Sequence, residues 1–288
     1  MRYVLAVAEL GSFTRAAEQC FVVQSALSHQ VKALERELGV TLFARTSRRV
    51  ELTPAGAAFL PEARRSVEAA ERAAADAAAA AGEVRGRLTI GMIPTVTAVD
   101  VPALLELFHR EYPQVRIELR GGGSGELAAG VRAGAVDVAL LGLPAPDEPA
   151  GVQHQVLESR RLVAAVGATH RLAGRDVVRL QDLADETFAD FPAATPGREQ
   201  SDRAFDAAGL RREVAFESMS PELLLGLVAR SLAVALLPEG VVPADGRFST
   251  MEVSDGPTRI EYLAWSEFNP SPAARAFVAS ARAAGVHA

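Results

Sequence analysis

Residues 11–60 read GSFTRAAEQCFVVQSALSHQVKALERELGVTLFARTSRRVELTPAGAAFL, and this stretch decides the fold of the N-terminal part of the chain. Its first half predicts two short helices, 13–20 and 24–38, joined by the turn 21–23. The second helix has an apolar face, because apolar residues recur at steps of three and four at Leu27, Val31, Leu34 and Leu38. A polar helix face that follows a three-residue turn and a shorter helix is typical of a helix-turn-helix that reads DNA. An ordinary solvated helix has the same pattern and remains the alternative.

The second half of the stretch predicts a small hairpin with a basic tip. Short apolar pieces at 41–43 and 49–52 flank the run Arg45-Thr46-Ser47-Arg48-Arg49. Arginine in such a wing neutralises phosphates or enters a narrow minor groove, which gives an affinity that falls with salt. A solvated surface loop is the alternative. Thr53-Pro54 then supplies an N-cap and a proline at the first helical position, so a new helix begins there.

The side chains that we expect to contact DNA lie on the polar face of helix 24–38, at the start of helix 13–20 and on the hairpin tip. Glutamine can bond both polar groups of an adenine edge, serine accommodates several base edges, and arginine is a strong partner of phosphate. The candidates are Ser12, Thr14, Gln24, Ser25, Ser28, His29, Lys32, Arg45, Thr46, Arg48 and Arg49.

A long alanine-rich helix is predicted from Pro54 to about Ala81, before Gly82 and Gly86. Small and apolar residues keep a 3-4 spacing over three heptads, which is typical of a seam for a partner helix. The seam consists of Leu60, Ala63, Val67, Ala70, Ala74, Ala77 and Ala81. Because alanine is also the best helix former, a helix without a partner is equally compatible with the composition.

The distribution of charge supports a DNA-binding N-terminal part. The net charge of the 288 residues is −6, but residues 1–65 contain nine basic and six acidic residues, a balance of +3. No apolar run approaches the roughly 18 residues of a membrane span, so we expect a cytoplasmic protein without membrane contact. The single cysteine, Cys20, cannot form an internal disulfide, and metal-binding Cys/His spacings are absent.

From residue 88 onward the chain alternates between predicted strands and helices, which indicates an α/β fold with a parallel sheet covered on both faces. The predicted elements up to residue 141 are strands 88–92, 115–119 and 136–141 and helices 101–112 and 124–133. Those further on are strands 161–166, 188–191, 214–217, 233–237, 248–253 and 260–265 and helices 197–208, 221–230 and 271–284. This half is long enough for two lobes.

Ligands of open α/β sheets bind beyond the carboxyl ends of the strands, where helix N-termini offer free N–H groups to anions. Two such ends carry hydroxyl groups, the segment Thr95-Val96-Thr97 and Ser124 after Gly121-Gly122-Gly123. A small carboxylate or similar anion fits such a site best, although an ordinary helix cap is the more common role of any single hydroxyl. The glycine run lacks the Gly-Lys-Ser/Thr of a P-loop and the Gly-x-Gly-x-x-Gly of a dinucleotide site, so no cofactor is expected.

As an ordered string, residues 11–60 resemble the DNA-binding signature of LysR-type transcription regulators. The matching elements are Gly11-Ser12-Phe13, Ala16-Ala17, Gln24, Ala26-Leu27-Ser28, Leu34-Glu35, Leu38-Gly39, Leu42-Phe43, Arg45 and Leu52-Thr53-Pro54-Ala55-Gly56. The chain departs from the family pattern at Val23, usually serine, at Ser25, usually proline, and at His29, often arginine.

The resemblance continues to residue 285 and implies an N-terminal all-α winged helix-turn-helix, a long linker helix and a periplasmic-binding-protein-like two-lobed α/β sensor domain. The implied domains are 1–56, 57–86 and 87–288, with lobe I at 87–158 and 266–288 and lobe II at 159–265. The family's effector site lies between the lobes, which would put Phe191 and the turn Ser218-Met219 on the wall opposite Thr95, Thr97 and Ser124.

The resemblance implies a sequence-specific regulator, modulated by a small-molecule effector, that binds promoter or operator DNA as a homodimer or homotetramer. RNA polymerase is a further candidate partner. Two other readings stay open: a cytosolic solute sensor that does not read DNA, and an enzyme on the same two-lobed fold. No nucleophile, metal or cofactor motif supports the enzyme, so none is expected.

Overall fold

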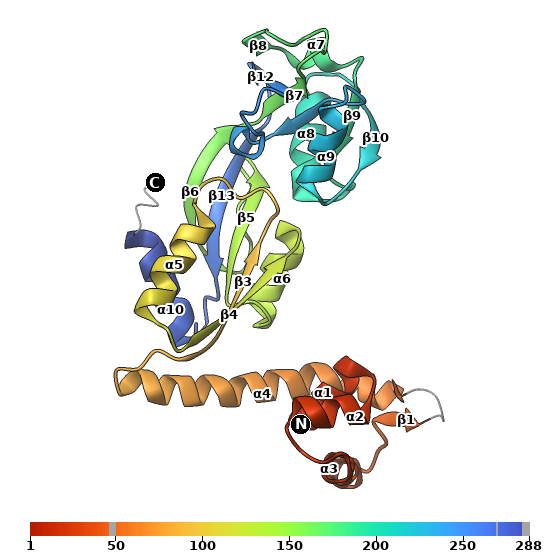
Figure 1. Ribbon diagram of the computed structural model, residues 1–288, viewed down its shortest axis with the longest axis vertical. Coiled ribbons are helices and arrows are strands. Elements are labelled where there is room, and N and C mark those ends of the chain that lie inside the picture. Colours follow the sequence, from red (N-terminus) through yellow and green to blue (C-terminus); the bar gives the residue numbers. More distant parts are fainter. Residues whose placement is uncertain (46–49, 269, 284–288) are drawn as a thin grey trace. The chain divides into compact units, whose positions relative to one another are not determined.

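The computed structural model describes residues 1–45, 50–268 and 270–283, which fold as two compact units, Met1–Ala81 and Gly82–Ala288 (Figure 1). The first unit contains the predicted helices and hairpin. Its elements are α1 (Arg2–Leu10), α2 (Phe13–Gln19), α3 (Gln24–Leu38), β1 (Phe43–Arg45), β2 (Val50–Leu52) and α4 (Pro54–Ala80). The predictions of α2, α3 and the long helix are confirmed to within a residue or so at each end.

A small apolar core holds the three short helices of the first unit to the hairpin. Its fully buried members include Val7, Leu27, Val31 and Leu42. The rings of Phe13 and Phe43 meet edge to face at 5.8 Å, an arrangement that aromatic pairs favour. The core thus ties the start of α2 to the first strand of the hairpin.

The geometry at the start of α4 requires particular residues within the sequence Leu-Thr-Pro-Ala-Gly at 52–56. The Thr53 hydroxyl accepts a hydrogen bond from the Gly56 N–H (3.0 Å) and donates one to the Thr41 carbonyl (2.6 Å). A Cβ atom at Gly56 would lie 2.1 Å from the Leu42 carbonyl oxygen. Only glycine therefore lets α4 pass so close to the backbone beside the hairpin.

Lobe I of the second unit is built on a five-stranded mixed sheet with the order β4-β3-β5-β13-β6. Its strands are β3 (Gly86–Met92), β4 (Val115–Gly121), β5 (Val138–Pro144), β6 (Gln153–Arg161) and β13 (Thr258–Trp265). The pairs β3·β4 and β3·β5 are parallel, as predicted for this alternating segment, whereas β13 pairs antiparallel with both β5 and β6.

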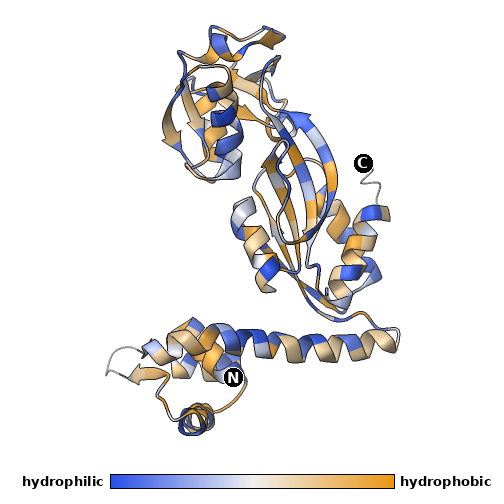
Figure 2. Ribbon diagram, turned by 180° about the vertical axis from the view of Figure 1, so that it is seen from behind, coloured by the Kyte–Doolittle hydropathy of each residue, from blue (hydrophilic) through white to orange (hydrophobic). Residues whose placement is uncertain are grey.

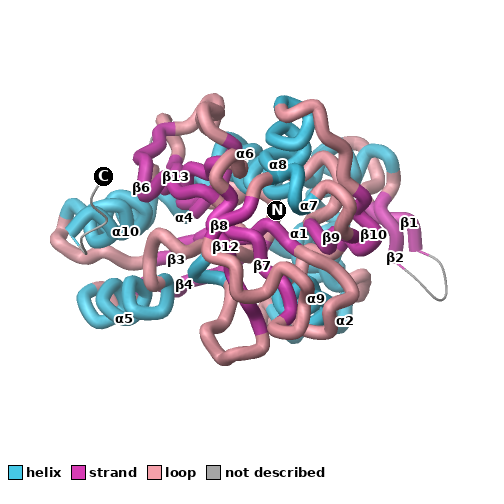
Figure 3. Tube along the Cα trace, turned by 90° about the horizontal axis from the view of Figure 1, so that it is seen from above, coloured by secondary structure: helices cyan, strands magenta, loops and turns pink. Residues whose placement is uncertain are grey.

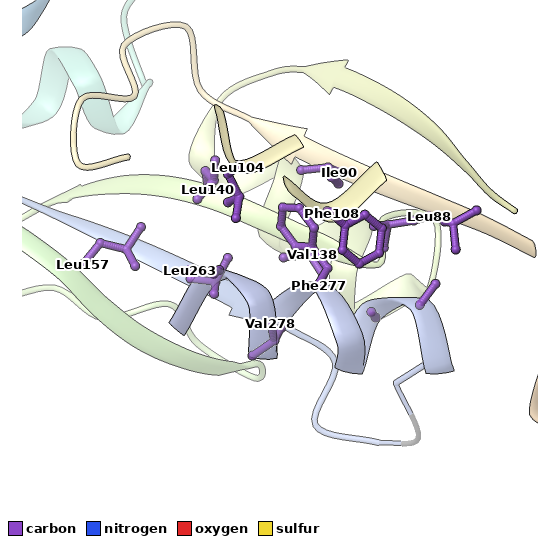
Figure 4. Packing of buried hydrophobic residues seen from close by; sticks show 14 residues of the cluster. Leu88, Ile90, Leu104, Phe108, Val138, Leu140, Leu157, Leu263, Phe277 and Val278 are labelled. Carbon is purple, nitrogen blue, oxygen red and sulfur yellow. The ribbon is translucent and has the colours of Figure 1, made fainter. Parts of the chain in front are cut away.

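Three helices cover this sheet: α5 (Val101–Glu111), α6 (Ser124–Ala133) and α10 (Pro272–Ala283). Helices α5 and α10 lie beside each other on one face and α6 on the other (Figures 1 and 3). Phe108 of α5 and Phe277 of α10 meet edge to face at 5.2 Å, inside the cluster shown in Figure 4. Both helices carry hydrophobic and hydrophilic residues, as two-faced helices of a layered fold must (Figure 2).

Lobe II contains a four-stranded sheet, β11-β7-β12-β8, and a parallel pair, β10-β9. Its strands are β7 (Val163–Gly167), β8 (Val177–Val178), β9 (Thr187–Asp190), β10 (Glu213–Glu217), β11 (Ala235–Leu237) and β12 (Phe248–Val253). Its helices are α7 (Leu180–Leu183), α8 (Pro196–Ala207), α9 (Pro221–Val228) and the single 3-10 turn η1 (Glu239–Val241).

The structure corrects the predicted boundary between the lobes. Strand β13 belongs to the sheet of lobe I along its whole length, so the chain returns to lobe I at 258 and not at 266. Strand β6 was not predicted at all. Its sequence, QHQVLESRR, is hydrophilic over much of its length (Figure 2), because it lies at the edge of the sheet and buries little. The elements β8 and α7 were also missed.

Candidate DNA interface and effector pocket

The face of α3 that we predicted to read DNA is exposed. Gln24, Ser25, His29 and Lys32 are exposed and Ser28 is half-buried, while Leu27 and Val31 on the opposite side are buried. The helix begins without a side-chain cap, because Val23 stands at the N-cap position. The Val23 carbonyl accepts hydrogen bonds from the N–H groups of Ala26 (3.1 Å) and Leu27 (3.2 Å). Backbone bonds therefore fix the helix start in the absence of a cap.

The start of α2 presents the other two candidates of the helical part. The Ser12 hydroxyl caps α2 by accepting a hydrogen bond from the Arg15 N–H (3.3 Å), while Thr14 is exposed. Ser12 thus acts first as a helix cap, and the N–H groups of this helix end suit a phosphate.

Two apolar side chains that sequence reasoning overlooked stand beside the start of α3. Phe21 is 96% exposed and has a left-handed backbone (φ 55°), and Val23 is 68% exposed. A positive φ is unusual for a bulky residue. The turn is held by hydrogen bonds from the Phe21 N–H to Glu18 (3.1 Å) and from the Val22 N–H to Ala17 (3.0 Å).

A carboxylate on α3 fixes the hairpin to that helix. Glu35 Oε1 accepts hydrogen bonds from the N–H groups of Leu42 (2.8 Å) and Phe43 (3.3 Å), at the start of β1. The predicted contacts Thr46, Arg48 and Arg49 lie outside the described residues. Of Arg45 only the backbone, at the end of β1, is described.

Four of the seven predicted effector residues, Thr95, Ser124, Phe191 and Met219, lie at a pocket lined by both lobes. Lobe I contributes Ile93 to Thr95, Gly122 to Ser124, Gly142 and Arg259, and lobe II contributes Phe191, Thr195 to Gly197 and Met219. The space, counted with its open mouth, is about 350 Å³. Most of that space is the open mouth: the free volume inside is about 30 Å³, which admits the head group of a ligand and not a whole one.

The predicted hydroxyl groups differ in their positions and in their hydrogen-bond partners. Thr95 and Ser124 line the pocket, but the Ser124 hydroxyl already donates to the Gly142 carbonyl (2.8 Å) and accepts from the Gly142 N–H (3.0 Å). Thr97 faces elsewhere and donates to Glu261 (2.6 Å). The Ser218 hydroxyl accepts a hydrogen bond from the Ser220 N–H (3.1 Å) and shapes the turn before α9.

The remaining predicted residues are apolar. Phe191 and Met219 line the pocket from lobe II, whereas Val96 lines an adjoining groove. The structure therefore brings Thr95, Ser124, Phe191 and Met219 together and leaves Thr97 and Ser218 outside.

Sequence reasoning missed Arg259, which is the charged side chain of the pocket. It is 5% exposed, and its guanidinium donates to the Thr95 hydroxyl and carbonyl (2.7 Å each) and pairs with Glu261. Burial lowers the pKa of Arg259 below its usual range, and the nearby Glu261 opposes that change. The available signal was the Arg-x-Glu pair in strand β13, TRIEYLAW, whose second half is mostly apolar.

A second buried ion pair supports the lobe II wall. Asp190 Oδ2 and Arg212 Nη2 lie 2.7 Å apart, and both side chains are almost fully buried. The Asp190 carboxylate also accepts a hydrogen bond from the Phe191 N–H (2.7 Å). The guanidinium also lies 5.0 Å from the centre of the Phe188 ring. Burial raises the pKa of Asp190 to about 6, although Arg212 acts in the opposite direction. This pair holds the backbone that presents Phe191.

Two classes of site have no support in the described ranges. Among residues 1–45, 50–268 and 270–283, no cluster of three His, Cys, Asp or Glu side chains could hold a metal ion. Within those same ranges, none of the helices combines the length and the apolar character that crossing a lipid bilayer requires.

Two family matches cover the chain almost end to end. Residues 1–57 match the bacterial regulatory helix-turn-helix protein, lysR family, and residues 81–285 match the LysR substrate binding domain. The boundaries of these matches follow the helix-turn-helix and the two-lobed unit described above.

Relatives and solved structures agree with these matches. The chain is 36% identical to the HTH-type transcriptional regulator ShiR of Corynebacterium glutamicum over 82% of this chain and 80% of that one. It is 32% identical to the DNA-binding transcriptional dual regulator OxyR of Escherichia coli, covering 85% and 80%. Full-length CbnR complexed with its target DNA matches with a TM-score of 0.72, 27% identity and coverage of 99% and 98%. The chain therefore belongs to the LysR family of DNA-binding transcription regulators, with an N-terminal helix-turn-helix and a C-terminal effector-binding domain.

Proposed function

We propose that this regulator reads its operator with α3 and the hairpin tip, as a homodimer or homotetramer, and that a small carboxylate in the pocket changes that binding. The observation that carries the proposal is the exposed polar face of α3 above a buried underside. Glu35 bonds the hairpin to the same helix. Base contacts by α3 and phosphate contacts by the hairpin would therefore form at the same time.

The proposed roles follow from chemistry and exposure. Gln24 would bond the edge of an adenine in the major groove, with Ser25, Ser28 and His29 beside it. Lys32, Thr14 and the arginines 45, 48 and 49 would neutralise or bond phosphates, which position the protein without reading sequence. Phe21 and Val23 are suited to contact with thymine methyl groups, which apolar side chains recognise.

Helix α4 supplies the proposed contact between copies of the chain. In the first part of the seam, Ala63 is buried within the unit and Leu60 packs against the helix-turn-helix core. Further along, Ala70, Ala74 and Ala77 are exposed at the same spacing. We propose that this later part packs on a second copy, and that the resulting assembly also presents a surface to RNA polymerase.

Coupling between pocket and DNA would act through populations of the assembly. A ligand that binds one arrangement of the lobes better than another shifts the equilibrium by its difference in affinity. Such a regulator would act on the bacterial chromosome and thus in the cytoplasm.

We do not extend the peroxide response of some relatives to this chain. Related sequences are named hydrogen peroxide-inducible genes activators. These 288 residues contain one cysteine, Cys20, at the end of α2, so a disulfide within one chain cannot form.

The test is fluorescence anisotropy of the full-length protein on the DNA upstream of its own gene, with a scrambled duplex as control and a series of salt concentrations. We expect tighter binding to the genomic duplex and a logarithmic salt slope that corresponds to several phosphates. Equal weak binding to both duplexes would contradict sequence reading by α3.

A further inference from the structure

We propose that Arg259 is the group that selects the effector: the pocket binds a monocarboxylate head group against Arg259 and the start of α6, and the ligand's apolar body lies in the adjoining groove. This inference rests on the proposed function of the pocket as the effector site. It adds to that proposal the side chain that recognises the carboxylate and the groove that holds the rest of the ligand.

The guanidinium has two N–H donors left for a ligand, one on Nε and one on Nη1. Of its five N–H groups, three are accounted for by the Thr95 hydroxyl, the Thr95 carbonyl and Glu261. Nε has no hydrogen-bond partner among the described residues. A charged acceptor that reaches this donor from the pocket would be bound strongly.

The glycine at 142 brings this donor to the pocket floor. A Cβ atom at Gly142 would lie 3.4 Å from Arg259 Nε and 3.2 Å from its Cδ, so the arginine stem passes directly over the bare backbone. The Ser124 hydroxyl accepts a hydrogen bond from the Gly142 N–H and donates one to the Gly142 carbonyl. Arg259 and the first turn of α6 are therefore anchored on one residue.

The negative partner of Arg259 faces away from the effector pocket. Glu261 accepts hydrogen bonds from the Thr97 N–H and hydroxyl and from the Ala98 N–H (3.2 Å). It lines a separate charged cavity near Glu158 and Arg160, whereas Arg259 lines both spaces. The side of the guanidinium that meets the effector pocket is thus positive.

The start of α6 adds to this positive side. Gly123 stands at the N-cap and no side chain caps the helix, so the N–H groups of the first turn are available to an anion. The one acidic residue of that turn, Glu126, lines the adjoining groove, and its Oε2 lies beside Gly122 at the border of the pocket, where a Cβ atom would be 3.1 Å from it. Charge complementarity therefore places a carboxylate head at the floor and away from the groove.

The groove is suited to the rest of the ligand. It shares Pro94, Thr195, Pro196 and Met219 with the pocket and continues along Met92, Val96, Val101, Leu119 and Ala194. Leu119 and Met219 are 51% and 40% exposed, so an apolar body that covers them gains affinity. Arg120, also in the groove, is already bonded to Glu118 (2.8 Å) and to the Ala135 carbonyl.

The experiment is calorimetry on the full-length protein with benzoate and hexanoate and with the matched amides, benzamide and hexanamide, at up to about 10 mM. We expect the carboxylates to bind at least about tenfold more tightly than the amides, and hexanoate to bind more tightly than acetate, which is titrated under the same conditions. The double variant Arg259→Gln/Glu261→Gln removes both charges, so that neither is left buried alone, and should lose the preference for carboxylate. Arg120→Gln is the matched control and should keep it.

An unchanged preference in the double variant would overturn the proposal, as would wild-type protein that binds its operator but none of the carboxylates. If the double variant does not fold, Arg259→Lys decides: weaker carboxylate binding supports the proposal and unchanged binding overturns it. Operator binding is measured on the same samples. Carboxylate preference without operator binding would contradict the regulator function and leave the assignment of Arg259 standing.

Discussion

At the scale of single residues, Gln24 carries the most direct prediction about DNA reading. Gln24→Ala should relax the preference at one base pair, losing about 1–3 kcal/mol of discrimination, with little change on scrambled DNA. Gln30→Ala is the matched control, because Gln30 is exposed on a different side of the same helix. Competition binding against operators with single substitutions measures the effect. Uniform weakening across all sequences would assign Gln24 to phosphate contact.

The raised pKa of the buried Asp190 makes the free energy of unfolding depend on pH. Its pKa is raised from 3.8 to about 6, so between these values the folded state keeps a proton that the unfolded state has lost. Raising the pH through that window therefore destabilises the folded protein, by up to about 3 kcal/mol at pH 7. Below pH 3.8 both states are protonated and the effect vanishes.

Chemical denaturation of wild type and Asp190→Asn from pH 4 to pH 7 tests this sign. The stability of the wild type relative to the variant should fall as the pH rises. A relative stability that rises over this range would mean that Arg212 outweighs burial and keeps Asp190 ionised.

Two important residues could not be predicted from sequence, for physical reasons. Arg259 is distant along the chain from Thr95 and Ser124, and only the antiparallel pairing of β13 with β5 brings it to them. Phe21 was predicted only as part of the turn 21–23, because its exposure depends on a left-handed backbone that composition does not reveal. Thr95 and Ser124 were predictable, since both follow strands whose carboxyl ends share one edge of the sheet.

At the scale of elements, the crossing of α4 beside the hairpin gives a test of packing. Gly56→Ala places a methyl group 2.1 Å from the Leu42 carbonyl oxygen, so the helix must shift. We expect a loss of about 1–3 kcal/mol in stability and weaker DNA binding, because the hairpin moves with the helix. Ala57→Ser, at an exposed position of the same turn, should change stability by less than about 0.5 kcal/mol. Equal melting of the two variants would contradict this account of Gly56.

The elements that sequence predicted well are those with strong local signals. Helix α3 has an apolar stripe and Gly39 at its end, in the left-handed conformation (φ 69°), and its predicted bounds agree with the structure. Strand β6 has no such stripe, and its place at a sheet edge removes the need for one. Which of the two lobes contains β13 is decided by its pairing with β5 and β6. Those strands are distant along the chain, so the local sequence pattern does not determine it.

At the scale of the whole molecule, the DNA-binding part and the effector-binding part carry net charges of opposite sign. The DNA-reading part has a positive balance within a chain of net charge −6, so the effector-binding part carries the acidic excess. The acidic part should be repelled by DNA phosphates while the basic part is attracted. We predict that the hairpin arginines supply part of the attraction, so Arg48→Ala should reduce the salt slope of operator binding by about 1 and weaken binding to every sequence alike.

The central claim is that this chain reads an operator with two copies of α3 set by a symmetric assembly. DNase I footprinting of the region upstream of its own gene tests it most directly. The account predicts two protected half-sites whose centres are separated by about 10 base pairs or a multiple of that spacing, because recognition helices enter the major groove on one side of the duplex. A single protected half-site, or protection that spreads without regard to sequence, would contradict it.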